Sequence, residues 1–383
     1  MQDSLETALL PQYEATPTST LDTDTSTCLV TVIVPTFREV ENLPILVPQV
    51  ANHLADAGIS FEIVVVDDNS QDGTDAACAK LAASFPLRLL VRTQDRGLSS
   101  AVLHGMRHAR GSLFVVMDAD LSHPPEKVPD LVKALQTDGA DFVIGSRYTP
   151  GGGTDENWGL FRWLNSKFAT LLAWPLTSTH DPMAGFFAIR RATFEAAAPL
   201  DPIGYKIGLE LIVKCRCQAI KEVPISFRDR VLGQSKLNFK EQLNYLRHLK
   251  RLYDFRFGAW AQLFQFICVG STGMIVDMLV FALLLLFLPE TLARGFAIWT
   301  AMTWNFFPNR KVTFSQGRAR SIGMQYVLFC MSCTLGSVVS WLTWYALYTA
   351  IPMFDGHPLL AAPAGIVTGT AFNFLLSKHL VFK

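Results

Sequence analysis

Two acidic pairs stand directly after apolar runs and could hold a cation. Asp67 and Asp68 follow "EIVVV", and Asp118 and Asp120 follow "LFVVM". Carboxylates this close repel one another and raise each other's pKa unless an opposite charge offsets them. A hard cation such as Mg²⁺ or Mn²⁺ supplies that charge and keeps positions for phosphate oxygens. The pairs favour a metal–diphosphate site, although each pair alone is also typical of a turn.

The elements that must position these residues are short apolar runs that alternate with amphipathic stretches. Near-continuous Val, Ile and Leu runs separated by helical segments predict a parallel sheet covered on both faces. Ligands bind at the carboxyl ends of the strands in such sheets, and the polar clusters "PTFRE", "DDNS", "DADLSH" and "SRY" fall there. The predicted strands are residues 28–35, 61–68, 86–91, 112–118 and 140–146, and helices are predicted at residues 41–57 and 72–83.

Composition and missing motifs exclude several classes of protein. The chain has 33 basic and 33 acidic residues, so it does not have the charge of a nucleic-acid-binding protein. Neither a P-loop nor a GxGxxG after the first strand is present, which disfavours a dinucleotide cradle. The seven cysteines suggest no disulfide framework, and the CxxC of Cys330 and Cys333 lies in an apolar run typical of helix packing.

Composition changes along the chain and divides it into four parts. Residues 1–27 are Thr-rich and acidic, without Lys or Arg, and predict a disordered tail. Residues 28–237 carry the α/β pattern and are the expected catalytic domain. Residues 238–258 combine leucines with basic residues and predict an amphipathic segment on a membrane surface. Residues 259–383 are largely apolar and predict a membrane domain.

The apolar part contains four candidate membrane spans. Basic residues crowd the middle connection, at Arg310, Lys311, Arg318 and Arg320, whereas the other two connections carry few. The positive-inside rule therefore predicts that the catalytic domain and both termini face the cytoplasm, across either a bacterial or archaeal plasma membrane or the ER membrane. The predicted spans are residues 260–288, 292–307, 322–351 and 359–376.

An internal sequence repeat indicates that the four spans are two duplicated helical hairpins. "NFFPNRKVTF" from Asn305 matches "NFLLSKHLVF" from Asn373, 68 positions further on. Asp277 lies in the middle of the first span, where a charge is costly. We expect it to face the helix bundle and to form a structural hydrogen bond, for example with Asn305 or Asn373.

Five motifs in fixed order resemble the dolichol-phosphate, or polyprenyl-phosphate, mannose synthases, which are family-2 glycosyltransferases of GT-A fold. They are "VTVIVPTFREVENLP", "EIVVVDDNSQDGT", "MDADLSHPPE", "GSRY" and "FRDRVLGQSKL". The likeness covers roughly residues 29–252 and implies an α/β, Rossmann-like domain with a mostly parallel sheet. The apolar part resembles the GtrA-like membrane module, which implies an all-α four-helix transmembrane domain.

The resemblance also implies roles for single residues. Asp118, Asp120 and Arg147 are the expected catalytic residues, and Asp118 and Asp120 are the expected ligands of Mg²⁺ or Mn²⁺. Ser122 is a further candidate ligand, in the place where some members have Gln. The positions that match the acceptor-phosphate contacts are Arg147, Arg162 and Ser166. Those that match the nucleotide-sugar pocket are Pro35, Phe37, Glu39, Val66, Asp68, Asp118, Ala119, Asp120, Arg230 and Lys236.

Two of these positions differ from other members of the family, and one neighbour has an expected supporting role. Phe37 stands where many members have Tyr, which keeps an aromatic face but removes a hydroxyl. Ser122 shortens the side chain beside the metal motif. His123 is expected to support the site rather than to bind metal.

The implied reaction moves mannose from GDP-mannose to dolichyl or another polyprenyl phosphate, by metal-assisted inverting displacement. A phosphate monoester is already anionic, so no general base is required. Two alternatives stay open: a glucosyltransferase that uses UDP-glucose, and a non-enzymatic translocase of lipid-linked sugars. The expected partners are the donor, the lipid acceptor and the bilayer, without nucleic acid, and a homo-oligomer is left open.

Overall fold

The chain forms two compact units, Met1–Tyr245 and Leu246–Lys383, in a computed structural model. The structure describes residues 29–137, 139–154, 160–227, 239–315, 320–354 and 358–383. The tail predicted for residues 1–27 lies outside these described residues. Each unit is described by itself below.

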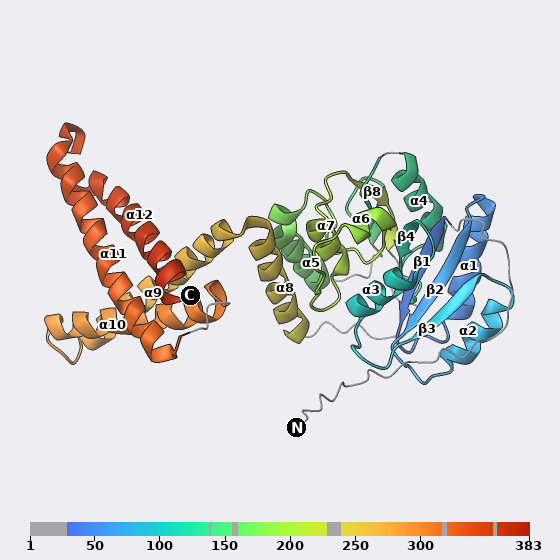
Figure 1. Ribbon diagram of the computed structural model, residues 1–383, viewed down its shortest axis with the longest axis horizontal. Helices are drawn as coiled ribbons and strands as arrows, with labels where there is room; N and C mark the ends of the chain where they lie inside the picture. Colours follow the sequence, from blue (N-terminus) through green and yellow to red (C-terminus); the bar gives the residue numbers. More distant parts are fainter. Residues whose placement is uncertain (1–28, 138, 155–159, 228–238, 316–319, 355–357) are drawn as a thin grey trace, which may run out of the picture. The chain divides into compact units, whose positions relative to one another are not determined.

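The first unit is built around a seven-stranded sheet in the order β3-β2-β1-β4-β7-β5-β8 (Figure 1). Strand β7 pairs antiparallel with β4 and β5, and the other neighbours pair in parallel. All five predicted strands are confirmed, and the sheet has two further strands, β7 and β8, that were not predicted from the sequence. Their bounds are β1 (Val30–Thr36), β2 (Phe61–Asp67), β3 (Leu87–Val91), β4 (Leu113–Val116), β5 (Phe142–Ser146), β7 (Phe187–Arg190) and β8 (Ile220–Pro224).

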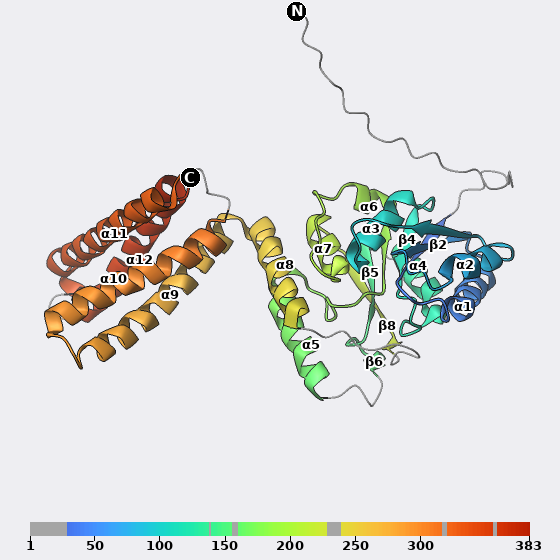
Figure 2. The same ribbon diagram turned by 90° about the horizontal axis from the view of Figure 1, so that it is seen from below.

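Helices cover both faces of this sheet (Figures 1 and 2). Along β1, Val32 and Val34 belong to one buried cluster and Ile33 to the other, because successive strand residues point to opposite faces. The first cluster includes α1 (Leu43–Asp56), α2 (Thr74–Ala82) and α4 (Val128–Thr137). The second includes α3 (Leu98–His108) and α7 (Ile207–Lys214). This is the predicted α/β architecture with a mostly parallel sheet.

Smaller elements complete the first unit. A short parallel pair joins β6 (Gly153–Thr154) to β9 (Ser226–Phe227). Helix α5 (Leu160–Ala173) follows β6, and α6 (Arg191–Glu195) follows β7.

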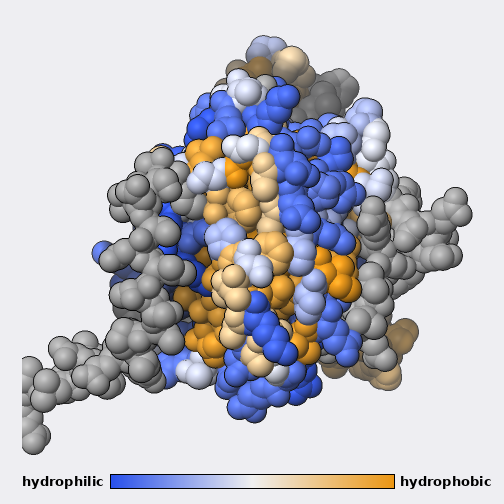
Figure 3. All heavy atoms as spheres, turned by 90° about the vertical axis from the view of Figure 1, so that its right-hand side faces the viewer, coloured by the Kyte–Doolittle hydropathy of each residue, from blue (hydrophilic) through white to orange (hydrophobic). Residues whose placement is uncertain are grey.

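One end of the unit carries apolar residues on its surface. Figure 3 shows a band of hydrophobic residues bordered by hydrophilic ones. Large exposed apolar side chains of this unit include Ile45 on α1 and Val91 on β3. Apolar residues make up much of any protein surface, so we assign no function to this face.

The second unit is helical and contains two helices long and apolar enough to cross a membrane. Within the described residues these are α9 (Ala259–Leu284) and α11 (Ile322–Ala350). The remaining two predicted spans are α10 (Glu290–Pro308) and α12 (Pro358–Leu376). Ahead of them, α8 (Phe239–Phe257) buries Leu249 and Leu252 of its leucine repeat, while Leu243 and Leu246 are exposed.

The predicted repeat is confirmed in the second unit. Helices α10 and α12 each continue into a π-helical turn, at Asn309–Thr313 and at Ser377–Val381. The two asparagines of the repeat occupy equivalent places: a Cβ at Gly273 would meet the Asn305 side chain, and a Cβ at Gly336 would lie 3.1 Å from Asn373 Cβ. Small residues thus let the two helices of each hairpin approach closely.

The predicted partner of Asp277 is wrong. Its carboxylate pairs with Arg294, whose Nη1 lies 2.7 Å from Asp277 Oδ2. Asn305 packs instead against Gly273, and Asn373 Oδ1 accepts a hydrogen bond from Ser332 Oγ at 2.7 Å. A full counter-charge on the neighbouring helix α10 offsets the cost of Asp277 better than an amide does.

The close approach of Gly111 to β1 predicts a stability effect. A Cβ at this position would lie 2.6 Å from the Thr31 backbone nitrogen, which belongs to the sheet and cannot move away. We expect Gly111→Ala to lower the free energy of unfolding by about 1–3 kcal/mol, measured as a fall in the midpoint of thermal unfolding. Gly153→Ala is the matched control, because its Cβ would meet nothing within 4 Å. An unchanged midpoint for Gly111→Ala would contradict the packing at this site.

Candidate active site

A cavity of about 820 Å³ lies at the carboxyl ends of β1, β2, β4 and β5. It forms there because parallel strands end at the same edge of the sheet and the loops that follow diverge from it. The structure brings together eight of the predicted site residues on its wall: Pro35, Phe37, Glu39, Asp68, Asp118, Ala119, Asp120 and Arg147.

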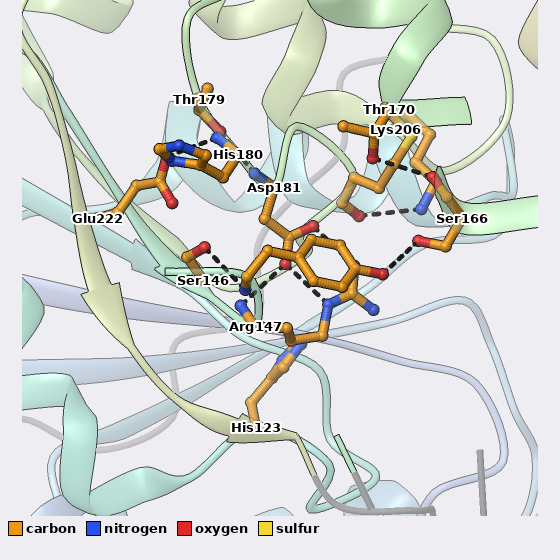
Figure 4. A network of polar contacts seen from close by, with 12 residues as sticks. His123, Ser146, Arg147, Ser166, Thr170, Thr179, His180, Asp181, Lys206 and Glu222 are labelled. Atoms are coloured by element: carbon orange, nitrogen blue, oxygen red, sulfur yellow. Dashed lines mark hydrogen bonds and ion pairs between the residues drawn. The ribbon is translucent and has the colours of Figure 1, made fainter. Parts of the chain in front are cut away.

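Other predicted residues are placed elsewhere or are not described. Val66 is fully buried in the core beneath α3 and does not line the cavity. Arg230 and Lys236 lie outside the described residues, as does the side chain of Arg162, although its backbone belongs to α5. Ser166, also on α5, accepts a hydrogen bond from the Tyr148 hydroxyl at 2.9 Å (Figure 4).

Only one member of the first acidic pair faces the cavity. Asp67 turns back into the structure, where its carboxylate accepts hydrogen bonds from Ser70 N at 2.8 Å and Thr36 Oγ1 at 3.2 Å. Asp68 lines the cavity and accepts a hydrogen bond from Gly97 N at 2.7 Å. Strand β1 also separates β2 from β4. Three of the four carboxylates of the two acidic pairs therefore reach the cavity: Asp67 supports the loop, whereas Asp68, Asp118 and Asp120 line the cavity wall.

The second acidic pair is held in place by its own loop. Asp120 is 4% exposed and accepts hydrogen bonds from Ser122 N at 3.1 Å and Ser122 Oγ at 2.6 Å. Ser122 itself is buried and is not brought to the cavity wall, so it orients Asp120. The side chain of Asp118 is 28% exposed and faces the cavity. Two carboxylates therefore reach the same space, one fixed and one accessible.

His123 supports this loop, as expected. Its Nδ1 accepts a hydrogen bond from Asp118 N at 3.0 Å, and its ring stacks on Phe186 at 5.2 Å between centroids. Burial lowers the pKa of His123, against the opposing charges of Asp118 and Asp120. A neutral imidazole agrees with an Nδ1 that accepts a hydrogen bond.

The space beside Asp118 fits a divalent cation. Position 185 is glycine, and a Cβ there would lie 3.5 Å from both Asp118 Oδ2 and His123 Cε1. In the part of the chain that the structure describes, no group of three or more His, Cys, Asp or Glu side chains is arranged to hold a metal ion by itself. Two carboxylates suit a hard cation that shares its remaining positions with phosphate oxygens and water. The donor set thus fits Mg²⁺ or Mn²⁺ bound jointly with a diphosphate.

Arg147, which follows β5, forms a buried ion pair with Asp181 (Figure 4). Its Nε and Nη2 donate to the two carboxylate oxygens of Asp181 at 2.8 and 2.7 Å, and its backbone N donates to Oδ2 at 3.1 Å. Asp181 is 0% exposed. Burial lowers the pKa of Arg147, but the hydrogen bonds and charge of Asp181 outweigh it and raise that pKa overall. The pair fixes the guanidinium beside the cavity.

Several residues of the cavity wall were not predicted from the sequence. Arg96 follows β3 and lies on the side of the cavity where Asp68 lies. Met183 and Lys206 lie on the opposite side, near Arg147. Asp181 and Met183 belong to "HDPMAGFF", the segment that leads into the unpredicted strand β7. Asp181 stands shortly before an apolar run, as Asp67 and Asp118 stand shortly after one, and this pattern could have marked it as a site residue. No such pattern marks Lys206, which stands directly before α7.

Two family models match successive parts of the chain. Residues 31–197 match the glycosyl transferase family 2 model, and residues 265–382 match the GtrA/DPMS transmembrane domain model. Among solved structures, glucosyl-3-phosphoglycerate synthase from Mycobacterium tuberculosis, in complex with Mn²⁺, UDP and glucosyl-3-phosphoglycerate, is 18% identical with a TM-score of 0.44. That match covers 60% of this chain and 80% of that one. The two family models define the class: a family-2 glycosyltransferase with a transmembrane domain.

Relatives along nearly the whole chain identify the family within that class. A dolichol-phosphate mannosyltransferase of Pyrococcus furiosus is 38% identical over 359 residues, which cover 92% of this chain and 99% of that protein. Proteins of the same name from Mycosarcoma maydis and Saccharomyces cerevisiae are 46% and 42% identical; they cover 61% and 62% of this chain, and the matches span 82% and 95% of those proteins. The chain belongs to the dolichol-phosphate mannosyltransferase family.

The buried pair predicts the effect of removing its negative charge. Asp181→Asn leaves the Arg147 guanidinium buried without a counter-charge, which costs about 3–5 kcal/mol of stability. We expect a large fall in the thermal unfolding midpoint. Asp130→Asn is the control, because Asp130 pairs with Lys127 on the surface of α4, where a pair contributes at most about 1 kcal/mol. Equal midpoints for the two variants would show that Asp181 is not the required counter-charge.

Proposed function

We propose that the chain transfers mannose from GDP-mannose to dolichyl or another polyprenyl phosphate. One observation carries the proposal: Asp118 and Asp120, which suit a cation, line the same cavity as Arg147, whose guanidinium suits a phosphate. Membership of the dolichol-phosphate mannosyltransferase family supports this choice of substrates.

The donor would lie at the ends of β1, β2 and β4. The aromatic face of Phe37, with Pro35, Glu39 and Asp68 near it, would hold the nucleoside. Asp118 and Asp120 would hold Mg²⁺ or Mn²⁺, and the cation would neutralise the leaving diphosphate. Ser122 keeps the Asp120 carboxylate oriented throughout. The roles of Arg230 and Lys236 toward the diphosphate stay predictions, because these residues lie outside the described part of the chain.

The acceptor would approach from the side of β5. Its phosphate oxygen attacks C1 of mannose, the bond from C1 to the diphosphate oxygen breaks, and GDP leaves with that electron pair. Because one displacement occurs, the anomeric configuration inverts. The acceptor is its own nucleophile, so the protein's work is orientation and charge stabilisation. Arg147, held by Asp181, orients the acceptor phosphate, and Ser166 and Arg162 are further predicted contacts.

We also propose the arrangement in the membrane. The catalytic domain spans residues 28–237, the juxtamembrane segment residues 238–258 and the four-span domain residues 259–383. Basic residues of the middle connection and the chain end, such as Arg310, Lys311 and Lys378, support a cytoplasmic location of the catalytic domain and both termini.

Loss of one metal ligand tests the catalytic proposal. Asp120→Ala should reduce mannosyl transfer by at least about a hundredfold, because metal stabilisation of the leaving group is worth several kcal/mol. Transfer is measured with purified full-length protein, labelled GDP-mannose, polyprenyl phosphate and Mg²⁺ or Mn²⁺, and folding by thermal unfolding. Asp130→Ala, outside the cavity, should retain activity. Full activity of a folded Asp120→Ala variant would remove the metal role.

Donor choice is tested in the same assay. We expect product with GDP-mannose and little with UDP-glucose at equal concentration. Product with UDP-glucose alone would identify the glucosyl alternative. No transfer from either donor, together with movement of mannosyl lipid across vesicles that contain the protein, would identify the translocase alternative.

A further inference from the structure

Lys206 reaches the cavity from the loop before α7 and has no role in the mechanism above. Its Nζ donates to the Met183 carbonyl at 3.0 Å, and its ammonium lies over the Tyr205 ring at 4.8 Å (Figure 4 shows its place near Arg147). Among the described residues, no carboxylate forms an ion pair with Lys206. A neutral carbonyl and a ring face offset only part of the cost of removing an ammonium from water.

The charges near Lys206 leave it without full compensation. The pKa of Lys206 is lowered to about 8: burial lowers it most, the positive charge of Arg147 also lowers it, and the charges of Asp181 and Asp118 raise it. The Asp181 carboxylate is already held by both nitrogens of the Arg147 fork. Asp118 is the carboxylate that fits the cation. The Arg147–Asp181 pair is neutral overall, so among the described residues of the cavity wall Lys206 adds the uncompensated positive charge on this side.

The carboxylate nearest to Lys206 in sequence, that of Glu210, binds other groups. Glu210 stands four positions further along the chain, at the spacing of a helical ion pair. Its carboxylate instead binds Lys214 Nζ at 2.8 Å and accepts a hydrogen bond from Asp201 N at 2.7 Å. Glu210 thus pairs with Lys214 and not with Lys206. Lys206, which lines the cavity, can therefore bind an anionic ligand there.

We propose that Lys206 binds the phosphate group of the lipid acceptor beside Arg147. The inference rests on the proposed function and adds a residue to it. A phosphate monoester carries up to two negative charges, which the neutral Arg147–Asp181 pair does not match and an added ammonium does. The position favours the acceptor over the donor, because Lys206 donates to Met183 and lies near Arg147, on the side of β5 and β7. Lys206 is a substrate-binding residue in this proposal, and it takes no proton in the reaction.

Two substitutions at Lys206 separate charge from packing. Lys206→Met keeps length and removes charge, and Lys206→Arg keeps charge. We expect Lys206→Met to raise KM for polyprenyl phosphate by about 10- to 100-fold, the range of a lost hydrogen bond to a charged group, with KM for GDP-mannose changed less than about twofold. Lys206→Arg should recover most of the loss. Lys127→Met, in the short helical turn before α4, is the control and should behave as wild type.

Three results would overturn the assignment. The first is an unchanged KM for polyprenyl phosphate in folded Lys206→Met. The second is a rise in KM for GDP-mannose in place of the acceptor, which would assign Lys206 to the donor diphosphate. The third is a fall in the thermal unfolding midpoint of Lys206→Met without a rise in KM, which would give the lysine a structural role through Met183. An unchanged or higher midpoint is expected, since a buried charge is removed.

A binding measurement keeps this inference separate from the proposed function. Farnesyl phosphate, a short soluble acceptor analogue, is titrated into wild type and Lys206→Met by calorimetry without donor. Weaker binding to Lys206→Met supports the inference even if wild type transfers no sugar, an outcome that would reject the function alone. Equal binding by both proteins, alongside mannosyl transfer by wild type, would reject Lys206 and leave the function standing.

Discussion

Strand β7 lies between β4 and β5 and runs antiparallel to both, and this insertion determines the layout of the site. Neighbouring strands are about 4.8 Å apart, so the ends of β4 and β5 are separated by about 10 Å. The carboxylates after β4 and the arginine after β5 therefore face one cavity from two sides. Because β7 is antiparallel, the segment that leads into it, with Asp181 and Gly185, enters at this same edge. Asp181 then holds Arg147, and Gly185 leaves space beside Asp118.

Two of the charges in the cavity are positioned by partners of matched chemistry. Asp120 is fixed by the backbone and hydroxyl of one serine, and Arg147 by both oxygens of one carboxylate. Ser122 and Asp181 are buried, so water does not compete for their hydrogen bonds to Asp120 and Arg147. Such preorganisation is what a displacement between two anions requires, since the protein supplies orientation and charge rather than proton transfer.

Sequence patterns predicted the strands and the acidic loops because burial on both faces requires continuous apolar runs. They could not reveal β7, whose four residues "FAIR" are too short to show a period. Residues that act through β7 were missed with it, above all Asp181. The direction of side chains was also beyond reach: Val66 faces the core, Asp67 its own loop and Ser122 its neighbour Asp120.

In the second unit the helices must associate without a strong hydrophobic driving force, and the internal repeat provides the contacts that hold them together. Between lipid-facing helices the hydrophobic effect provides little attraction, so close contact and polar pairs must act instead. Asn305 and Asn373 pack at glycines of the preceding helices, Gly273 and Gly336. Phenylalanines 68 positions apart then meet in one cluster: Phe306 and Phe374, and Phe314 and Phe382, together with Phe266 and Phe329. Since Phe314 stacks on Phe382 at 4.9 Å, equivalent residues of the two hairpins contact each other directly. The two copies of the motif therefore pack against each other, and their contact joins the first hairpin, α9 and α10, to the second, α11 and α12.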